Sequence, residues 1–214
     1  MEITDAERRV SENVFGDRLD LAERFVNHLA TTGIERGLLG PREVPKLWSR
    51  HVLNCAVVGD LIPADVHVAD VGSGAGLPGL ALAIARHDLS VTLIEPLERR
   101  VQWLTEVVQD LDLSNVTVVR GRAEQVVESV NADVVTARAV SALSRLVQLT
   151  IPLLHGQGEV LAIKGHSAGD ELDTAAKKIR KLGGTGTSVL TAGAVLLNEP
   201  TTVVRIIVGE GLQR

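Results

Sequence analysis

The sequence predicts an α/β fold in which helices cover both faces of a mostly parallel β-sheet. Three observations carry this prediction. β-Branched runs alternate with amphipathic stretches after Pro63, a glycine-rich turn follows the first run, and the last two runs lie too close together for a crossover helix. The five alternating runs cover residues 66–71, 91–95, 116–120, 133–137 and 159–164. This rhythm is typical of a Rossmann-like fold.

The two strand-like runs nearest the C-terminus cover residues 188–197 and 202–208, with only 198–201 between them. Parallel neighbours need a connection of a dozen or more residues, so we expect these two runs to pair as an antiparallel hairpin at the sheet edge. Dinucleotide-binding sheets end in parallel strands instead. The sequence therefore predicts a seven-stranded sheet with an antiparallel terminal hairpin.

The first part of the chain lacks strand-like runs, and we expect residues 1–62 to form an N-terminal helical cap ahead of a ligand-binding domain at 63–214. Apolar residues recur every four positions within 17–30, which is the spacing of one helical face. Pro45 suits the first turn of a further helix. The cap is therefore expected to pack on the larger domain.

Composition limits the classes of function. A formal net charge of −5 argues against a protein that coats nucleic acid nonspecifically, so any RNA contact must be local. With two Trp, two Phe and no Tyr, an aromatic stacking platform is not expected. No apolar run approaches the roughly 20 residues that span a bilayer, and the single cysteine, Cys55, can form neither an internal disulfide nor a thiolate metal site. We expect a cytoplasmic monomer with no metal and no membrane or DNA partner.

The most specific motif is the stretch 70–79, DVGSGAGLPG, which follows the first strand and opens a helix. Its glycines allow positive φ and a close approach of the backbone to a ligand. Gly74, Gly76 and Gly79 also match the nicotinamide-cofactor fingerprint, so spacing alone leaves the ligand open. Asp70 favours S-adenosylmethionine, because an acid at this strand end repels a pyrophosphate and attracts a cationic methionine group.

Three further positions follow strands at the same carboxyl edge. Glu95 ends the second run, where such folds place an acid against the ribose hydroxyls. Ala123 and Glu124 follow the third run, where a backbone N–H and a carboxylate suit an adenine ring. Arg138 lies between two alanines after the fourth run, which favours a ligand contact. The alternatives are an exposed strand-end Glu95 and a Glu124 that merely lies in the first turn of a helix.

At these residues the sequence resembles the bacterial 16S ribosomal RNA guanine-N7 methyltransferases, the glucose-inhibited division protein B family. The resemblance runs from Trp48 through Lys164. It rests on Arg50-His51-Val52-Leu53, the stretch 70–79, Ala123-Glu124, Arg138-Ala139 and Lys164-Gly165. It implies a class I methyltransferase sheet and an enzyme that uses S-adenosylmethionine to methylate N7 of a specific guanine in 16S (small-subunit) rRNA.

The family's cofactor-binding positions carry over onto part of the predicted site. With the residues inferred from the strand ends, the predicted cofactor set is Asp70, Gly72, Gly74, Gly76, Leu77, Glu95, Ala123, Glu124 and Arg138. The chain departs from the family at Asn54-Cys55, where Asp-Ser is common, so a carboxylate at this point is not essential here.

Guanine N7 already offers an in-plane lone pair, so we expect catalysis by orientation, with no catalytic residue and no general base. Candidate RNA contacts, with the small subunit or its 16S rRNA as partner, are Lys46, Arg50, His51 and Lys164. Lys46 and Arg50 share a helix face, although solvated surface is the alternative for such residues. Three other functions stay open: a nicotinamide-dependent oxidoreductase, a cofactor-binding protein without catalysis, and a methyltransferase of small molecules or proteins.

Overall fold

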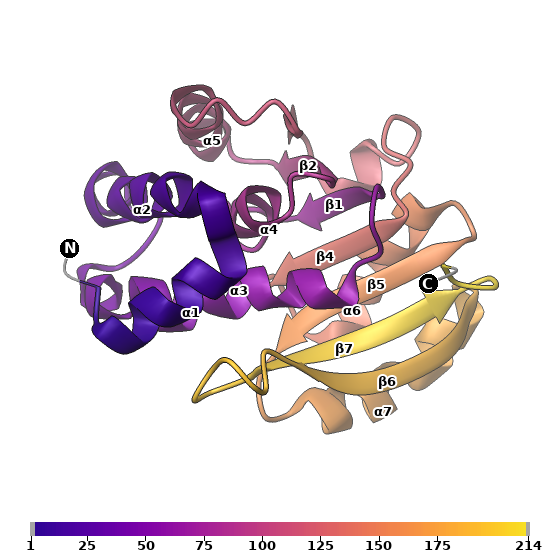
Figure 1. Cartoon of the computed structure of the whole chain (residues 1–214). Coiled ribbons are helices and arrows are strands. Elements are labelled where there is room, and N and C mark those ends of the chain that lie inside the picture. The colour runs from indigo at the N-terminus through magenta and orange to yellow at the C-terminus, as the bar shows by residue number, and fades with distance from the viewer. Residues whose placement is uncertain (1–2, 213–214) are drawn as a thin grey trace.

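The computed structural model describes residues 3–212, and its centre is a seven-stranded sheet (Figure 1). The strands lie in the order β3-β2-β1-β4-β5-β7-β6. Strands β1 to β5 are parallel, whereas β7 runs antiparallel to both β5 and β6. Their bounds are β1 His67–Val71, β2 Ser90–Glu95, β3 Val116–Arg120, β4 Val134–Arg138, β5 Gly158–Lys164, β6 Gly184–Ala192 and β7 Thr201–Val208. The predicted sheet with an antiparallel terminal hairpin is confirmed.

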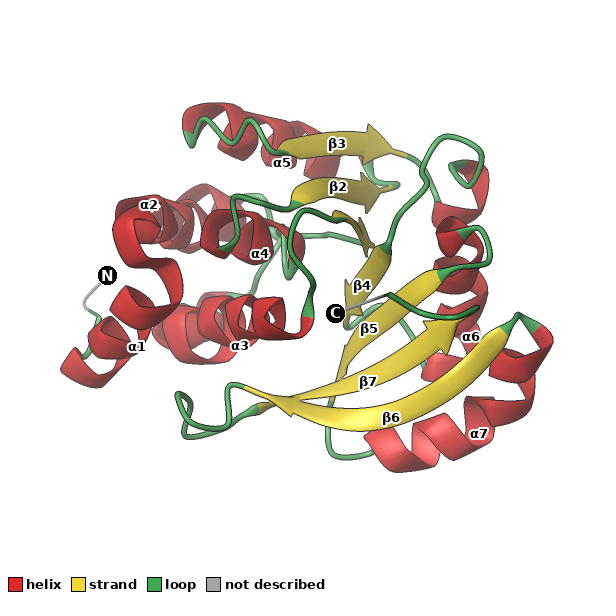
Figure 2. Ribbon diagram, turned by 45° about the vertical axis from the view of Figure 1, so that its right-hand side comes forward, coloured by secondary structure: helices red, strands yellow, loops and turns green. Residues whose placement is uncertain are grey.

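Helices cover both faces of this sheet, α1 to α5 on one side and α6 and α7 on the other (Figure 2). The α-helices are α1 Asp5–Phe15, α2 Leu19–His28, α3 Asn54–Ala56, α4 Gly79–Ala85, α5 Glu98–Asp110, α6 Leu143–Thr150 and α7 Ala168–Lys181. The short 3-10 or π segments are η1 Gly16–Arg18, η2 Leu29–Gly33, η3 Pro41–Lys46, η4 Leu47–Leu53, η5 Val57–Leu61, η6 Ala123–Gln125 and η7 Ile151–Leu154. Within the described residues, no helix is long and apolar enough to cross a membrane.

Alternation along the strands divides the core between the two faces. In β4, Val134 belongs to the core beneath α4 and the N-terminal helices, while its neighbour Val135 belongs to the core beneath α6 and α7. Val68 and Ala69 divide in the same way in β1. Because both faces of these central strands are buried, they appear in the sequence as nearly continuous apolar runs.

The helical N-terminal segment shares one hydrophobic core with the sheet. Phe25 of α2 and Trp103 of α5 are fully buried in the same cluster. The Trp103 indole N–H also donates to Oγ1 of Thr32 at 2.9 Å, which satisfies its one polar group. The packing is therefore continuous from α2, through η2, to the sheet.

Two expectations for the N-terminal helices are wrong in detail. The continuous helix expected at 17–30 is divided into η1, α2 and the π-helical η2. Pro45 lies near the end of η3 rather than in the first turn of the next helix. The apolar spacing nevertheless identified the buried face, because Phe25 and Leu29 are both fully buried.

The expected bounds of the first hairpin strand are also wrong. β6 ends at Ala192, and the turn connecting it to β7 spans residues 193–200. Gly193, with φ +69°, reverses the chain, and its carbonyl accepts the N–H groups of Leu196 and Leu197 at 3.0 and 2.9 Å. These apolar residues look like strand in the sequence but pack back on the core. Oγ1 of Thr201 then donates to the Asn54 carbonyl (2.8 Å), which holds the hairpin against α3.

Candidate active site

The glycine turn between β1 and α4 combines tight packing with one position that has room for a Cβ. Gly72, Gly74 and Gly76 have φ values of +71°, +56° and +78°, which favour glycine. A Cβ on Gly76 would lie 2.4 Å from Leu80, so that position is closed by helix packing. A Cβ on Gly74 would meet no atom nearer than 3.7 Å. A Cβ at Gly74 would therefore make only ordinary van der Waals contacts, with the Gly72 carbonyl and Nη1 of Arg100, while Leu77 is buried beneath the turn.

Asp70 lies beneath the turn, fully buried at the end of β1. Its Oδ2 accepts the N–H of Gly79, the first residue of α4, at 3.0 Å. Its Oδ1 is buried without a hydrogen-bond partner. Burial raises the pKa of the Asp70 carboxyl to about 7. A buried acceptor with a free oxygen is costly unless a ligand or water completes it.

Glu95 supports the turn from β2. It is 1% exposed, and Oε2 accepts the Gly74 N–H at 3.0 Å while Oε1 accepts the Leu97 N–H at 2.9 Å. Nη1 of Arg100 lies 3.7 Å from Oε2. Each carboxylate oxygen keeps a second lone pair for a further donor. The exposed-glutamate alternative for Glu95 is therefore wrong.

Ala123 and Glu124 follow β3 in the short segment η6. Ala123 is buried and Glu124 is exposed. The parallel strands β1, β2 and β3 all end at one edge of the sheet, so η6 and the glycine turn lie on the same side of the molecule. This arrangement brings the predicted adenine position to the same edge as Glu95.

Arg138, at the end of β4, is held by the N-terminal segment. Its guanidinium donates to Nδ1 of His51 and lies 3.4 Å from the carbonyls of Arg50 and His51 and 3.3 Å from Sγ of Cys55. Nε2 of His51 is 2.7 Å from Glu43, completing a chain of three side chains. Burial lowers the pKa of His51, and the hydrogen bond from His51 lowers that of Glu43. A neutral His51 accepts from Arg138 at Nδ1 and donates to Glu43 from Nε2, so each of the three side chains has a hydrogen-bond partner.

A cavity of about 790 Å³ opens beside Arg138, between η4 and the strand ends of β4, β5 and β7. Ala139 in its wall has a left-handed φ of +54°, a strain that concentrates at functional sites. Lys164, another wall residue, donates to the Ser141 carbonyl and to Glu171, both at 2.8 Å. Lys164 therefore anchors the chain after β4 to α7.

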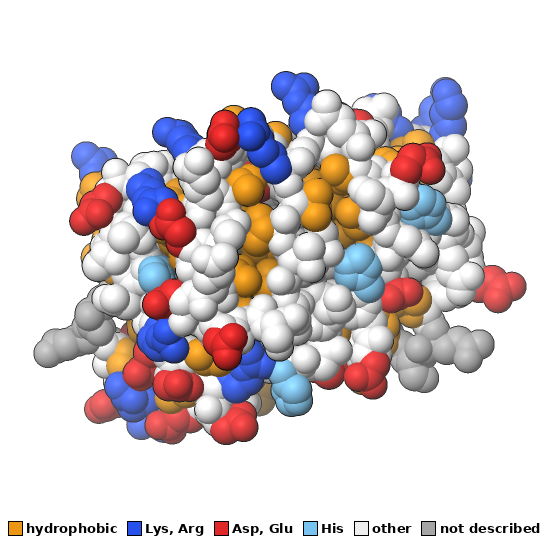
Figure 3. Space-filling model, turned by 90° about the horizontal axis from the view of Figure 1, so that it is seen from above, with side chains coloured by type: hydrophobic (Ala, Val, Ile, Leu, Met, Phe, Trp, Pro, Cys, Tyr) orange, Lys and Arg blue, Asp and Glu red, His pale blue; other side chains and the backbone are white. Residues whose placement is uncertain are grey.

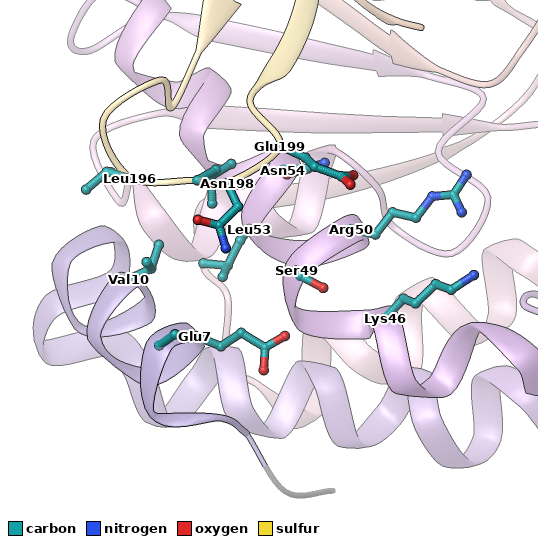
Figure 4. Close-up of a pocket in the computed structure, with 12 residues that line it drawn as sticks. Glu7, Val10, Lys46, Ser49, Arg50, Leu53, Asn54, Leu196, Asn198 and Glu199 are labelled. Carbon is teal, nitrogen blue, oxygen red and sulfur yellow. The ribbon is translucent and has the colours of Figure 1, made fainter.

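A second cavity of about 700 Å³ lies between α1, η4 and the turn 193–200 (Figure 4). Lys46 and Arg50, both exposed, extend in the same direction along its rim. His51, by contrast, is buried and points to Glu43. The structure therefore brings two of the four predicted RNA contacts together on an accessible surface, whereas His51 and Lys164 are engaged internally.

Sequence reasoning missed two participants. Arg100 looked like one of two arginines on a solvated helix face, but its Nε is buried without a partner and its Nη1 approaches Gly74. Its position in the first turn of α5, five residues after Glu95, was the available signal. Glu43 lies eight residues before His51, in the separate segment η3, and only the packing of η3 on η4 brings the pair into contact.

The chain has the Rossmann-like fold of the class I methyltransferases. Solved structures with the same fold include a methyltransferase from Pyrococcus furiosus, with a TM-score of 0.58, 15% identity and coverage of 72% of this chain and 80% of that one. Another is M. jannaschii TYW2, described in complex with AdoMet, with a TM-score of 0.55, 18% identity and coverage of 75% and 76%. At these identities the likeness concerns the fold alone.

The family follows from the sequence comparisons. The sequence model for rRNA small subunit methyltransferase G, GidB, matches residues 18–198. A protein of Pseudarthrobacter chlorophenolicus named ribosomal RNA small subunit methyltransferase G is 70% identical over 210 residues, 98% of this chain and 97% of its own length. The chain belongs to the rRNA small subunit methyltransferase G family, and the resemblance that its motifs indicated is confirmed.

Proposed function

We propose that this protein transfers a methyl group from S-adenosylmethionine to N7 of one guanine in 16S rRNA, as free RNA or within the small ribosomal subunit. The observation that carries the proposal is the juxtaposition at one sheet edge of the glycine turn, with Asp70 beneath it, and a large cavity beside Arg138. A cofactor and a base can meet there. Family membership supports rRNA as the substrate class.

The residues present fit the cofactor. Oδ1 of Asp70 is a buried acceptor without a partner, and Gly74, which has no side chain and a positive φ, lets a ligand approach the backbone. The proposed binding residues are Asp70, Gly72, Gly74, Gly76, Leu77, Glu95, Ala123, Glu124 and Arg138. Glu95 would hold the ribose through its remaining lone pairs while continuing to support the turn.

When bound, S-adenosylmethionine supplies an electrophilic methyl group on a sulfonium. The attacking N7 lone pair is already free, so the chain needs no base to activate it. The protein's contribution is to orient the guanine in the cavity, exclude water and avoid opposing the positive charge that the ring acquires. A buried, neutral His51 is consistent with a positioning role through Arg138.

RNA docking is proposed for the helical segment 1–62, with Lys46 and Arg50 on its accessible rim. On the face shown in Figure 3, acidic and basic side chains are interspersed and form no single basic field. With a net charge of −5, docking must therefore depend on local contacts. His51 and Lys164 line the cavity beside Arg138, and both are still proposed as RNA contacts there. The protein is proposed to act as a cytoplasmic monomer.

The test is to map N7-methylguanosine in 16S rRNA from cells with and without the protein, then restore the mark in vitro with purified protein and S-adenosylmethionine. One guanine should lack the N7-methyl group in cells without the protein and regain it in vitro. A shift of the melting temperature by S-adenosylmethionine and none by nicotinamide cofactors would exclude the oxidoreductase alternative. An unchanged rRNA, with transfer to another acceptor, would overturn the proposal.

A further inference from the structure

One carboxylate in the proposed base-binding cavity has no part in the function described so far. Arg50, Asn54 and Glu199 line both cavities and so form the wall between them. Glu199 is exposed, and its carboxylate forms no hydrogen bond or ion pair with any residue in the range 3–212. The other carboxylate in the cavity, Glu43, is already engaged by His51. Of these two carboxylates, Glu199 is therefore the one left for a ligand.

The fold places Glu199 across the cavity from Arg138, one of the proposed cofactor-binding residues. β4 ends at Arg138 and β7 begins at Thr201, and β5 lies between them. Neighbouring strands are about 4.8 Å apart, so these two points are separated by roughly 10 Å, which accommodates a purine with a hydrogen bond at its far edge. The bond from Thr201 to the Asn54 carbonyl anchors the chain just after Glu199.

Glu199 is placed where a carboxylate can distinguish guanine from adenine. N7 occurs in both adenine and guanine, so the reacting atom does not distinguish them. The Watson–Crick edge does, because guanine presents N1–H and an exocyclic amine where adenine presents an N1 acceptor. This edge is opposite N7. A carboxylate is an acceptor only, so it matches guanine and opposes adenine.

We propose that Glu199 selects the target guanine by accepting hydrogen bonds from its N1–H and exocyclic amine while N7 faces the cofactor. This inference rests on the proposed function. No proton moves in the step: the N7 lone pair forms the bond to the methyl carbon as the sulfur–methyl bond breaks, and the electron pair of that bond stays on sulfur, which leaves as the neutral thioether S-adenosylhomocysteine. The positive charge thereby passes from sulfur to the ring, and Glu199 stays a carboxylate. A negative charge at the far edge then stabilises the cationic ring, so Glu199 favours the transition state as well as binding.

The experiment compares wild type with Glu199→Gln on reconstituted small subunits that carry guanosine or inosine at the methylated position. Inosine keeps N1–H and N7 but lacks the exocyclic amine. With guanosine, the variant should lose roughly ten- to a hundredfold in kcat/KM. Wild type should lose roughly tenfold or more on inosine, whereas the variant should show almost no further loss. Glu12→Gln, an equal charge change on α1 outside both cavities, should match wild type.

Calorimetric titration with S-adenosylmethionine and a melting curve complete the test. Both should be unchanged in Glu199→Gln. Wild-type activity in the variant, an undiminished inosine penalty, or a loss of cofactor affinity would each overturn the assignment. Absence of methylation by the wild-type protein on the guanosine subunit would instead count against the proposed function, so the two failures are distinguishable.

Discussion

The two halves of the candidate site differ in how their polar groups are satisfied. Around the glycine turn, the chain itself holds them: Glu95 accepts two backbone N–H groups and Asp70 a third. Along the cavities, Lys46 and Glu199 are exposed and project from helical or turn segments. Apart from Oδ1 of Asp70 and Nε of Arg100, the polar side chains of the first half are held by the chain, whereas Lys46 and Glu199 in the second half depend on a ligand for partners. Substitutions should therefore affect the two halves in different ways.

The largest effect is expected from Gly74→Val, which should abolish S-adenosylmethionine binding. A branched residue is strained at a φ of +56°, and its side chain would project toward Arg100, where the ligand is proposed to approach the turn. Calorimetric titration is the measurement, with a melting curve to show that the variant is folded. A folded variant of unchanged affinity would remove the turn from the cofactor site.

Glu95→Ala should weaken cofactor affinity by roughly ten- to a hundredfold, the equivalent of losing charge-assisted bonds worth about 1.5 to 3 kcal/mol. It should also lower the free energy of unfolding, because the N–H groups of Gly74 and Leu97 lose their acceptor. Glu95→Gln, which keeps the shape, should be milder in both respects. Equal cofactor affinity for Glu95→Ala and wild type would refute the ribose assignment.

Asp70 should give the half around the glycine turn a pH dependence. Burial raises its pKa from 3.8 to about 7, so its contribution to folding is fully present below pH 3.8 and is lost as pH rises through 7. Asp70→Asn should remove this dependence and stabilise the ligand-free protein above pH 7 by a few kcal/mol at most. Urea unfolding between pH 5 and 8 measures it.

Cofactor affinity should show the opposite trend with pH. A charged Asp70 attracts the cationic cofactor, so wild-type affinity should increase as pH rises through about 7, while Asp70→Asn binds weakly and without this trend. Titrations at pH 6 and 8 compare the two proteins. Parallel profiles would show that Asp70 does not face the bound cation.

The smallest effect on the cofactor half should come from the double substitution Lys46→Glu, Arg50→Glu, which ought to leave cofactor affinity and melting temperature unchanged. If the two residues contact phosphates, binding to small subunits should weaken and its salt dependence should decrease, because fewer counterions are released. The matched control is Lys177→Glu, Lys181→Glu on α7, across the sheet. If the two double variants bind small subunits with the same affinity and salt dependence, Lys46 and Arg50 are solvated surface residues and not RNA contacts.

The sequence by itself determined the sheet and its glycine turn. β-Branched runs with apolar residues toward both faces specify buried parallel strands, and the glycines of 70–79 specify positive φ, so both are local properties of the chain. The same reasoning failed at 193–197, where Leu196 and Leu197 turn back onto the core. Local hydrophobicity does not tell a strand from a loop that packs.

Only the tertiary structure decided which side chains meet. Arg138, His51 and Glu43 come from β4, η4 and η3, and their contact depends on how the N-terminal segment packs on the sheet. Glu199 reaches the cavity because Thr201 is tied to Asn54, 147 residues away in sequence. Such contacts leave no periodic signal, because they depend on long-range packing and not on the backbone preferences of neighbouring residues.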